Sequence, residues 1–262
     1  GLRRRAGFLR WMPPRMRGHA LRGIRPGLHA LLLAVAAMTL LAVFDSGTID
    51  LAVSRLAFDP ETHNFPMKHH WLFDDLLHFG LKSLAYILAA PALALCLSGV
   101  SGKLPWLPPR NALLAAGGMI LIPLATAGLK AVTNRHCPWS IDEFGGFAPY
   151  VGLLYPAPAD LARGVCFPAG HARAGFAWLA WVPALWLTRP RAARRILAGA
   201  LFAGVAMGAA RIMQGAHFAS HVFWSAWLAW SVCIGLTALL RADVTGAGAA
   251  ESILEFRGRQ NA

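Results

Sequence analysis

Charged residues are scarce in this sequence, and acidic residues are the scarcest. Only 14% of its 262 residues are charged, with 12 acidic against 25 basic side chains, whereas 56% are hydrophobic. Soluble globular domains carry about 25% charged residues, so the composition excludes an ordinary soluble domain and predicts an integral membrane protein. The net charge of +13 could indicate nucleic-acid binding. The basic residues lie mostly beside apolar runs, however, which is typical of membrane topology, and no nucleic-acid partner is expected.

Cysteine is rare too, and its scarcity excludes a disulfide-rich scaffold. The chain has four cysteines. Cys96 and Cys233 fall inside apolar runs and are expected to be small core residues. Cys137 and Cys166 fall in a polar segment instead. Acidic residues are absent from the interior of the apolar runs, which argues against a proton-coupled or ion-coupled carrier.

Long apolar runs make up most of the chain and predict an all-α, polytopic membrane protein with six transmembrane helices. Four expected spans are residues 28–44, 76–98, 111–132 and 169–187. A fifth follows the Arg-rich connector 189–195 and ends near Arg211, and the sixth covers 217–240. The chain therefore divides into a basic tail at 1–27, a membrane domain at 28–240 and a second tail at 241–262.

The distribution of lysine and arginine predicts the orientation of these spans. Seventeen of the 25 basic residues fall in the two tails and in the connectors 99–110 and 189–195, so these segments are expected to be cytoplasmic. The tail at 1–27 has eight arginines and no acidic residue, which is typical of contact with anionic lipids. The other eight lie at or near the opposite face: Arg55, Lys68, Lys82, Lys130, Arg135, Arg163, Arg173 and Arg211. A basic residue kept there against the topological bias is a candidate for a specific role.

Two polar loops are expected on that opposite face. The loop of about 36 residues at 133–168 is unusually long for a connector, and loops of this kind commonly carry function. The loop between the first two spans contains histidines and aspartates that could suggest a metal site: His63, His69, His70, Asp74 and Asp75. Their spacing matches no standard ligand set, and a wet interfacial loop explains them, so no metal or other cofactor is predicted.

An arginine and two histidines, Arg211, His217 and His221, precede or begin the last span. A guanidinium can bind phosphoryl oxygens through its forked donors, and an imidazole can act as a nucleophile or proton carrier. If the helix begins at His217, the two histidines lie four residues apart on one helical face. The alternative is that these histidines only contact lipid headgroups, and that Lys130 and Arg211 only extend their charges toward the interface.

Taken together, three segments resemble the type 2 phosphatidic acid phosphatase superfamily. Its signature is Lys, six residues, Arg-Pro; then Pro-Ser-Gly-His; then Ser-Arg, five residues, His, three residues, Asp. Spacing agrees in all three blocks, and seven of the eleven signature positions match: Lys130, Pro138, Pro168, Gly170, His171, Arg211 and His217. The other four differ, with Cys137 for arginine, Ala169 for serine, Ala210 for serine and His221 for aspartate.

The resemblance implies a mechanism without a metal ion. His217 would attack phosphorus and form a phosphohistidine, while His171 would protonate the leaving oxygen. The phosphoryl oxygens would be bound by Lys130, Arg211, the N–H groups around Gly170, and Arg135 in place of the missing arginine.

The implied activity is removal of phosphate from a membrane lipid phosphate or diphosphate. The active site would face the periplasm, at the outer leaflet of a bacterial inner membrane. Candidate substrates are lipid A phosphates, isoprenoid diphosphates and phosphatidylglycerol phosphate. The alternatives are a lipid phosphotransferase of the same fold and a non-catalytic membrane protein that binds lipid phosphates. The sequence separates neither these activities nor oligomeric states.

Two expectations concern residues that differ from the family pattern. Cys137 and Cys166 lie beside the first two blocks, in a compartment expected to be oxidising, so we expect a disulfide between them, with two free thiols as the alternative. His221 occupies the position of the family's aspartate, which accepts the N–H of the nucleophilic histidine. A neutral imidazole can also accept that hydrogen bond, so His221 is expected to orient His217. The alternative is that His221 donates to substrate phosphate.

Overall fold

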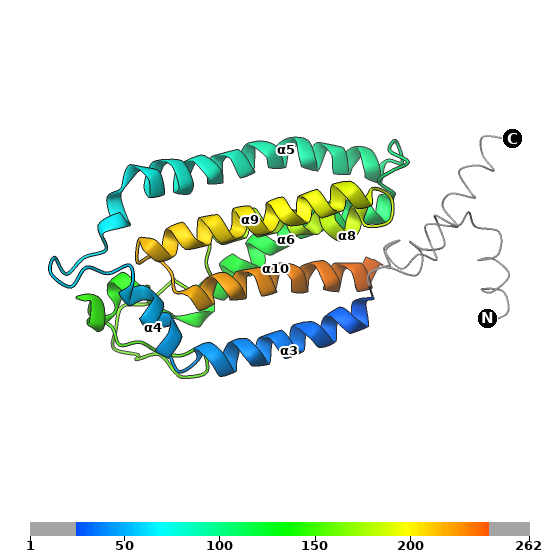
Figure 1. The fold of residues 1–262 in the computed structure, drawn as a ribbon. Coiled ribbons are helices and arrows are strands. Elements are labelled where there is room, and N and C mark those ends of the chain that lie inside the picture. Colours follow the sequence, from blue (N-terminus) through cyan, green and yellow to red (C-terminus); the bar gives the residue numbers. More distant parts are fainter. Residues whose placement is uncertain (1–24, 241–262) are drawn as a thin grey trace, which may run out of the picture.

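The computed structural model describes residues 25–240, apart from six side chains between 74 and 82. The two predicted tails therefore lie outside the described residues, except for the end of the first, and the side chains of Asp74, Asp75 and Lys82 are not described. Five helices in this part are long and apolar enough to cross a membrane. They are α3 (Pro26–Phe44), α5 (Leu81–Val100), α6 (Pro109–Thr133), α9 (Pro190–Met213) and α10 (Ala219–Leu240), which run along one long axis (Figure 1).

Helices α3 and α5 form the rim of this bundle. Helix α3 starts with Pro26 at its first turn, where a missing N–H costs nothing, and none of its residues is buried. Its main contacts with other helices are with α10 and with the short helix α4 (Thr48–Arg55). Large apolar side chains such as Leu31 and Met38 are well exposed on α3. That surface suits a helix whose outer face meets lipid chains.

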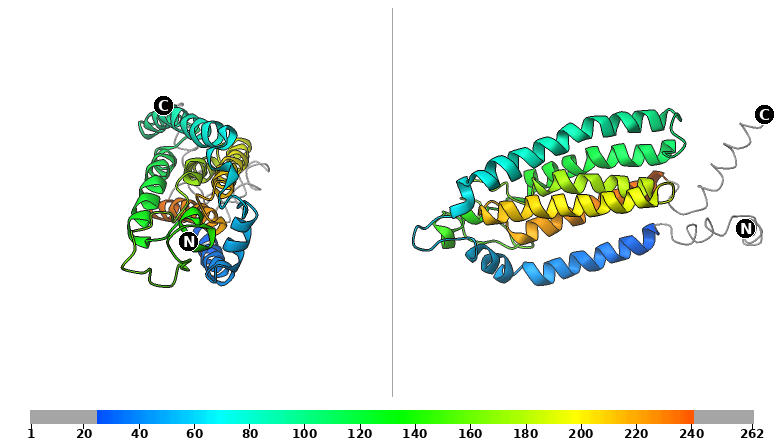
Figure 2. Two further views of the ribbon diagram at one scale, coloured as in Figure 1. Left: turned by 90° about the vertical axis from the view of Figure 1, so that its left-hand side faces the viewer. Right: turned by 45° about the horizontal axis from the view of Figure 1, so that its top comes forward.

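The predicted fourth span is shorter than expected. It consists of α7 (Ala172–Phe176), η5 (Ala177–Ala180) and α8 (Trp181–Leu185), which together make 14 residues. The segment lies in the middle of the bundle against α6, α9 and α10 (Figure 2). Fourteen helical residues extend about 21 Å, less than the roughly 30 Å of a hydrocarbon core. This segment is a buried central element, and a count of six spans stays a prediction.

Two predicted helix boundaries are wrong. The Arg-rich residues 189–195 do not form a separate connector, because α9 starts at Pro190 and includes most of them. The last helix starts at Ala219, so His217 lies in the loop before it rather than on its face. The loop is shaped by Gly215, whose φ of +70° favours glycine and whose Cβ would lie 2.4 Å from the ring of Phe65.

One end of the bundle is covered by short elements and loops. They are α4, η1 (Pro66–His69), the π-helix η2 (Leu72–Gly80), η3 (Pro138–Ser140) and η4 (Asp142–Phe144). A small second core packs α4, η3 and η4 together and consists of Ala57, Phe65, Ile141, Phe144 and Phe218, with Leu51 and Trp139 against it. Phe218 comes from the loop between α9 and α10, so this core also positions the segment that contains His217.

Candidate active site

Three chain segments that lie far apart in sequence converge at the covered end of the bundle. Lys130 is in the last turn of α6, His171 caps the start of α7, and Arg211 is in the last turn of α9. The rings of His171 and His217 have centroids 6.4 Å apart. A cavity of about 390 Å³ opens beside His171 and is lined by Tyr86, Ala127, Lys130, Gly170, His171, Arg173 and Ala174.

Lys130 lies directly against Gly170. Its Nζ donates to the carbonyl of Val165 at 3.0 Å. A Cβ on Gly170 would lie 3.1 Å from Cε of Lys130 and 3.4 Å from Nζ, so any larger residue would displace the ammonium group. The glycine therefore brings a lysine and the backbone before α7 together, which suits an anion-binding surface.

Arg211 and Lys68 share an aromatic neighbour, Trp139. The guanidinium carbon of Arg211 lies 5.8 Å from the Trp139 ring and Nζ of Lys68 lies 5.2 Å from it. Arg211 Nη1 donates to Oε1 of Gln214 at 2.8 Å, and Gln214 Nε2 donates to the Lys68 carbonyl at 3.2 Å. Arg211 is thereby held at the end of α9 with a defined orientation.

His217 is buried, with 4% of its surface exposed. Burial lowers the pKa of His217 well below 6.5, and the nearby His221, Lys130, His171 and Arg211 lower it further because each disfavours a second positive charge. A ring with such a pKa is neutral at pH 7. Burial and the nearby Lys130 and Arg211 therefore favour the neutral imidazole that a nucleophilic histidine needs.

Arg135 was predicted to bind phosphate, and the structure places it elsewhere. Its guanidinium donates to four backbone carbonyls: Thr133 at 3.0 Å, Asn134 at 3.1 Å, Leu153 at 3.0 Å and Tyr155 at 2.6 Å. Both terminal nitrogens are therefore fully used. Arg135 lines a separate small cavity of about 30 Å³, together with His221. It holds the long loop in shape and offers no forked donor to a phosphate.

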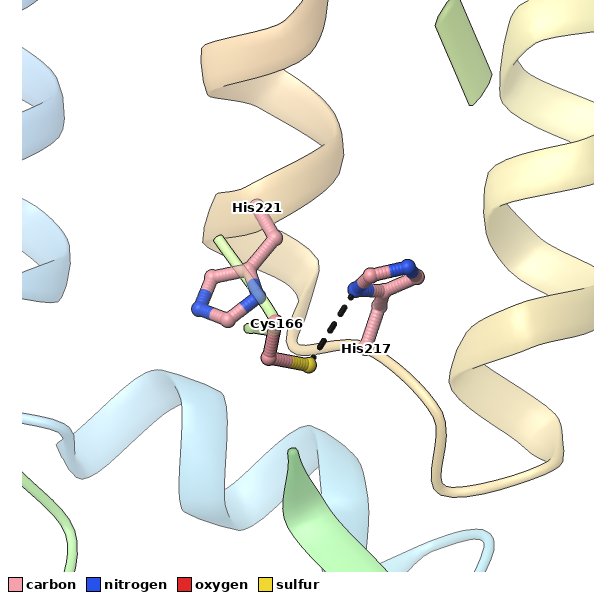
Figure 3. Close-up of side chains that lie close together, drawn as sticks. All are labelled: Cys166, His217 and His221. Carbon is pink, nitrogen blue, oxygen red and sulfur yellow. Dashed lines mark hydrogen bonds between the residues drawn. The ribbon is translucent and has the colours of Figure 1, made fainter. Parts of the chain in front are cut away.

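Cys137 and Cys166 form a disulfide, with Cα atoms 5.3 Å apart. The Sγ of Cys166 lies 3.3 Å from Nδ1 of His217, as the dashed line in Figure 3 marks. The ring of His221 donates to the backbone carbonyl of the same cysteine. Both histidines thus have Cys166 as a partner, although the sequence predicted that His221 would hold His217 directly. Their ring centroids are 5.9 Å apart, and Nδ1 of His221 is buried without a hydrogen-bond partner.

Cys166, His217 and His221 are also the group of possible metal ligands found within the described part of the chain. Their ligand atoms lie within 4.8 Å of one another. A metal ion needs the cysteine as a thiolate, and this sulfur is bonded to Cys137. The group as it stands does not fit a metal ion.

The comparison with family profiles decides the relationship of the chain. The profile of the PAP2 superfamily, the type 2 phosphatidic acid phosphatases, matches residues 111–244. The chain belongs to the PAP2 superfamily. PAP2 proteins are phosphatases and phosphotransferases, so a reaction at a phosphate ester is the expected class of activity. Comparisons with curated proteins and with solved structures gave no match.

One residue that lines the cavity was not singled out from the sequence. Arg173 lines the cavity beside Lys130 and His171, and its Nη1 donates to the Pro123 carbonyl at 3.0 Å. Sequence analysis noted Arg173 only as one of eight basic residues kept against the topological bias. Its position two residues after His171, in the first turn of a buried helix, was the signal that pointed to the cavity.

A buried carboxylate supports the segment between His217, in the loop before α10, and His221, in α10. Asp50 of α4 accepts the backbone N–H of Ser220 at 2.9 Å through Oδ1, and the Ser220 hydroxyl through Oδ2. Tyr150 also donates to it, at 3.4 Å. Burial raises the pKa of Asp50, while these hydrogen bonds lower it. Asp50 thus caps the start of α10 from a different helix.

Proposed function

We propose that this PAP2 protein is a membrane lipid phosphatase that works through a phosphohistidine on His217, without a metal ion. The observation that carries the proposal is the convergence of Lys130 and His171, which line one cavity, with the buried His217 and with Arg211 close to that histidine. Cations and backbone N–H groups around a phosphoryl group supply the electrostatic stabilisation that dominates phosphoryl transfer.

The proposed reaction has two steps. In the first, Nε2 of His217 attacks phosphorus, the bond from phosphorus to the lipid oxygen breaks, and His171 donates a proton to that oxygen. In the second, His171 removes a proton from water, whose oxygen attacks the phosphohistidine and releases inorganic phosphate. Lys130 and Arg211 balance the charge of the transferred group throughout.

An apolar groove next to the cavity favours a lipid over a soluble phosphate ester. The groove has a volume of about 240 Å³ and lies between α5, the central segment and α9. Its walls are apolar: Leu84, Ala85, Leu88, Gly175, Trp178, Ile196, Gly199, Ala200, Ala203 and Met207. Tyr86 of α5 and Ala174 of α7 line the adjoining cavity. A lipid could therefore place its phosphate at Lys130 and its chain in the groove, entering sideways from the bilayer.

The distribution of basic residues supports an outer-leaflet site. The two tails and the connectors 99–110 and 189–195 contain 17 of the 25 basic residues. Segments rich in lysine and arginine stay on the cytoplasmic side of the membrane. The candidate site lies at the end of the bundle opposite the connectors (Figure 1). The proposal therefore places the reaction at the periplasmic face of a bacterial inner membrane.

One experiment tests the proposal and its alternatives. Purified protein in detergent, with EDTA and no added metal, is incubated with lipid A, isoprenoid diphosphate and phosphatidylglycerol phosphate. Free phosphate and phosphorylated lipid acceptors are then measured. Release of phosphate supports the phosphatase, transfer to a lipid supports a phosphotransferase, and binding without turnover supports a non-catalytic lipid-phosphate binder.

A further inference from the structure

A sulfur of the Cys137–Cys166 disulfide lies in contact with a ring nitrogen of His217. A disulfide sulfur has no hydrogen, so it can accept a hydrogen bond but cannot donate one. The other close neighbour of this sulfur, the Ala216 carbonyl at 3.1 Å, also has no hydrogen to give. At 3.3 Å from this sulfur, Nδ1 of His217 gains a favourable contact only when it carries the N–H.

We propose that the Cys137–Cys166 disulfide is the positioning group of His217, holding it in the tautomer with the proton on Nδ1. The remaining nitrogen, Nε2, then has a free electron pair for phosphorus. The role of that electron pair rests on the proposed function, whereas the tautomer is a property of the protein alone. The sulfur takes over the work expected of His221, whose own ring donates to the Cys166 carbonyl instead.

The same geometry makes the site sensitive to reduction. A dithiol reductant opens the disulfide, leaves two cysteine thiols and is itself oxidised to a disulfide. The new S–H of Cys166 can donate to Nδ1 of His217, which favours the opposite tautomer with the proton on Nε2. That tautomer has no electron pair at the attacking nitrogen. The ratio of the two tautomers should change by about two- to tenfold, as for the loss of one hydrogen bond.

Nitrogen NMR of the full-length protein reads the tautomer directly. The protein is labelled with ¹⁵N-histidine, purified in detergent, and the signals of His217 are identified by their loss in His217→Gln. Protonated and bare ring nitrogens of a neutral imidazole differ in chemical shift. We expect Nδ1 to be the protonated nitrogen in the oxidised protein and the Nε2-protonated form to increase after reduction. Equal tautomer ratios in both states, with the open disulfide verified by mass, would overturn the proposal.

A second experiment separates the sulfur from the loop closure that the disulfide also provides. Cys137→Ala leaves Cys166 as a thiol, and methyl methanethiosulfonate converts it to a methyl disulfide with release of methanesulfinic acid. The loop stays open, but the sulfur next to His217 is again acceptor-only. We expect kcat/KM for a lipid phosphate to fall about two- to tenfold in the thiol form and to recover after modification. A thiol form with unchanged activity, or no recovery in fully modified protein, would show that this sulfur does not position His217.

Two controls keep these outcomes distinct. Cys137→Ala/Cys166→Ala receives the same reagent and reports any effect of modifying Cys96 or Cys233. All reduced samples contain EDTA, because free Cys166 with His217 and His221 could bind a metal ion. A loss of activity seen only without EDTA would mean metal inhibition and would count against the proposal. If the wild-type protein has no phosphatase activity, the proposed function fails, and the NMR result still decides the tautomer.

Discussion

Both ends of the helical bundle are basic, but their cations do different work. At the connector end, which contains residues 99–110 and 189–195, Lys103, Arg191 and Arg194 are exposed. At the site end, Lys130 and Arg211 are partly buried and each has a defined partner. Exposed cations beside a span set topology, whereas cations withdrawn from water interact strongly with an anion. A count of basic residues indicates only the topological role, whereas the structure shows which cations are placed to interact with an anion.

The largest effect should come from removing the proposed nucleophile of the site end. His217→Ala is expected to lower kcat by at least about 10³-fold, since no other group can take up the phosphoryl group. His171→Ala should be less severe, with a loss of about 10²–10⁴-fold, because only proton transfer is removed. Radiolabelled substrate should give acid-labile, base-stable labelling of wild-type protein and none of His217→Ala. A fully active His217→Ala protein contradicts the proposed mechanism.

Two arginines at the same end sharpen the comparison, because the guanidinium of Arg135 is bound by loop carbonyls whereas Arg211 lies near His217. Arg211→Lys keeps the charge but loses the fork, and kcat should fall by about 10²-fold with unchanged thermal stability. Arg135→Lys should do the reverse: the loop carbonyls lose donors, and unfolding becomes easier by about 1–3 kcal/mol, while kcat per folded molecule changes little. Thermal unfolding in detergent and kinetics on the same samples measure both. A stable but inactive Arg135→Lys protein would restore the predicted phosphate role of Arg135.

The surroundings of Arg135 could not be predicted from the sequence, and the reason is physical. Spacing showed that an arginine lay near the expected position, but not that four carbonyls from residues 133 to 155 would surround it. The family pattern fixes the spacing of Lys130, Gly170, His171 and His217, whose roles stay predictions, and the disulfide pair was expected from compartment and position. The remaining contacts join residues that lie far apart in the sequence, so the sequence does not reveal them. Cys166 and His217 are 51 residues apart, and nothing local indicates that their side chains touch.

The fold shows the same limit. Most spans were predicted well, because the backbone polar groups of each long apolar run must be hydrogen-bonded within a helix. The segment 169–187 was predicted to be a span like the others. An apolar run does not say whether lipid or protein surrounds it, and here the helices α6, α9 and α10 surround the segment. The element that carries His171 is therefore the one that is hidden inside the protein rather than exposed to lipid.

A substitution in the apolar groove is expected to have an effect of intermediate size on kcat/KM. Gly199 lines the groove, and a Cβ there would meet nothing within 4 Å. Gly199→Leu should fill the groove without moving the backbone, lowering kcat/KM for long-chain lipid phosphates by about tenfold, the loss expected for one or two buried methylene groups. Activity on a short-chain phosphate should stay unchanged. Gly235→Leu on α10, also open at its Cβ, is the matched control. Equal losses for both chain lengths would mean that the groove does not hold the lipid chain.

The pH profile of kcat/KM tests the influence of the buried cations of the site end, and the expected effect is smaller. Because burial and nearby positive charges lower the pKa of His217, its ring stays neutral as the pH falls through 6.5. Protonation of His217 should therefore not reduce kcat/KM between about pH 7.5 and 6. Lys130→Met removes one of these charges, so the pKa should rise and the acidic limb should move to higher pH, in addition to a lower rate. The outcome that contradicts a neutral His217 is an acidic limb of kcat/KM near pH 6.5 that is present in wild type and stays in every variant.

The smallest effect is expected at the connector end. Arg191→Ala/Arg194→Ala removes two exposed cations of α9 from the end of the bundle opposite the site. The segments predicted to be cytoplasmic would still hold 15 basic residues against eight elsewhere, so the positive-inside bias keeps its sign and the orientation should not change. Screening makes a distant exposed charge nearly irrelevant to the cavity, so kcat/KM should stay within about twofold of wild type. Cysteine-accessibility labelling checks the topology in the same membranes. A large loss of activity with unchanged topology would show that these arginines reach the substrate, and the contrast between the two ends would not hold.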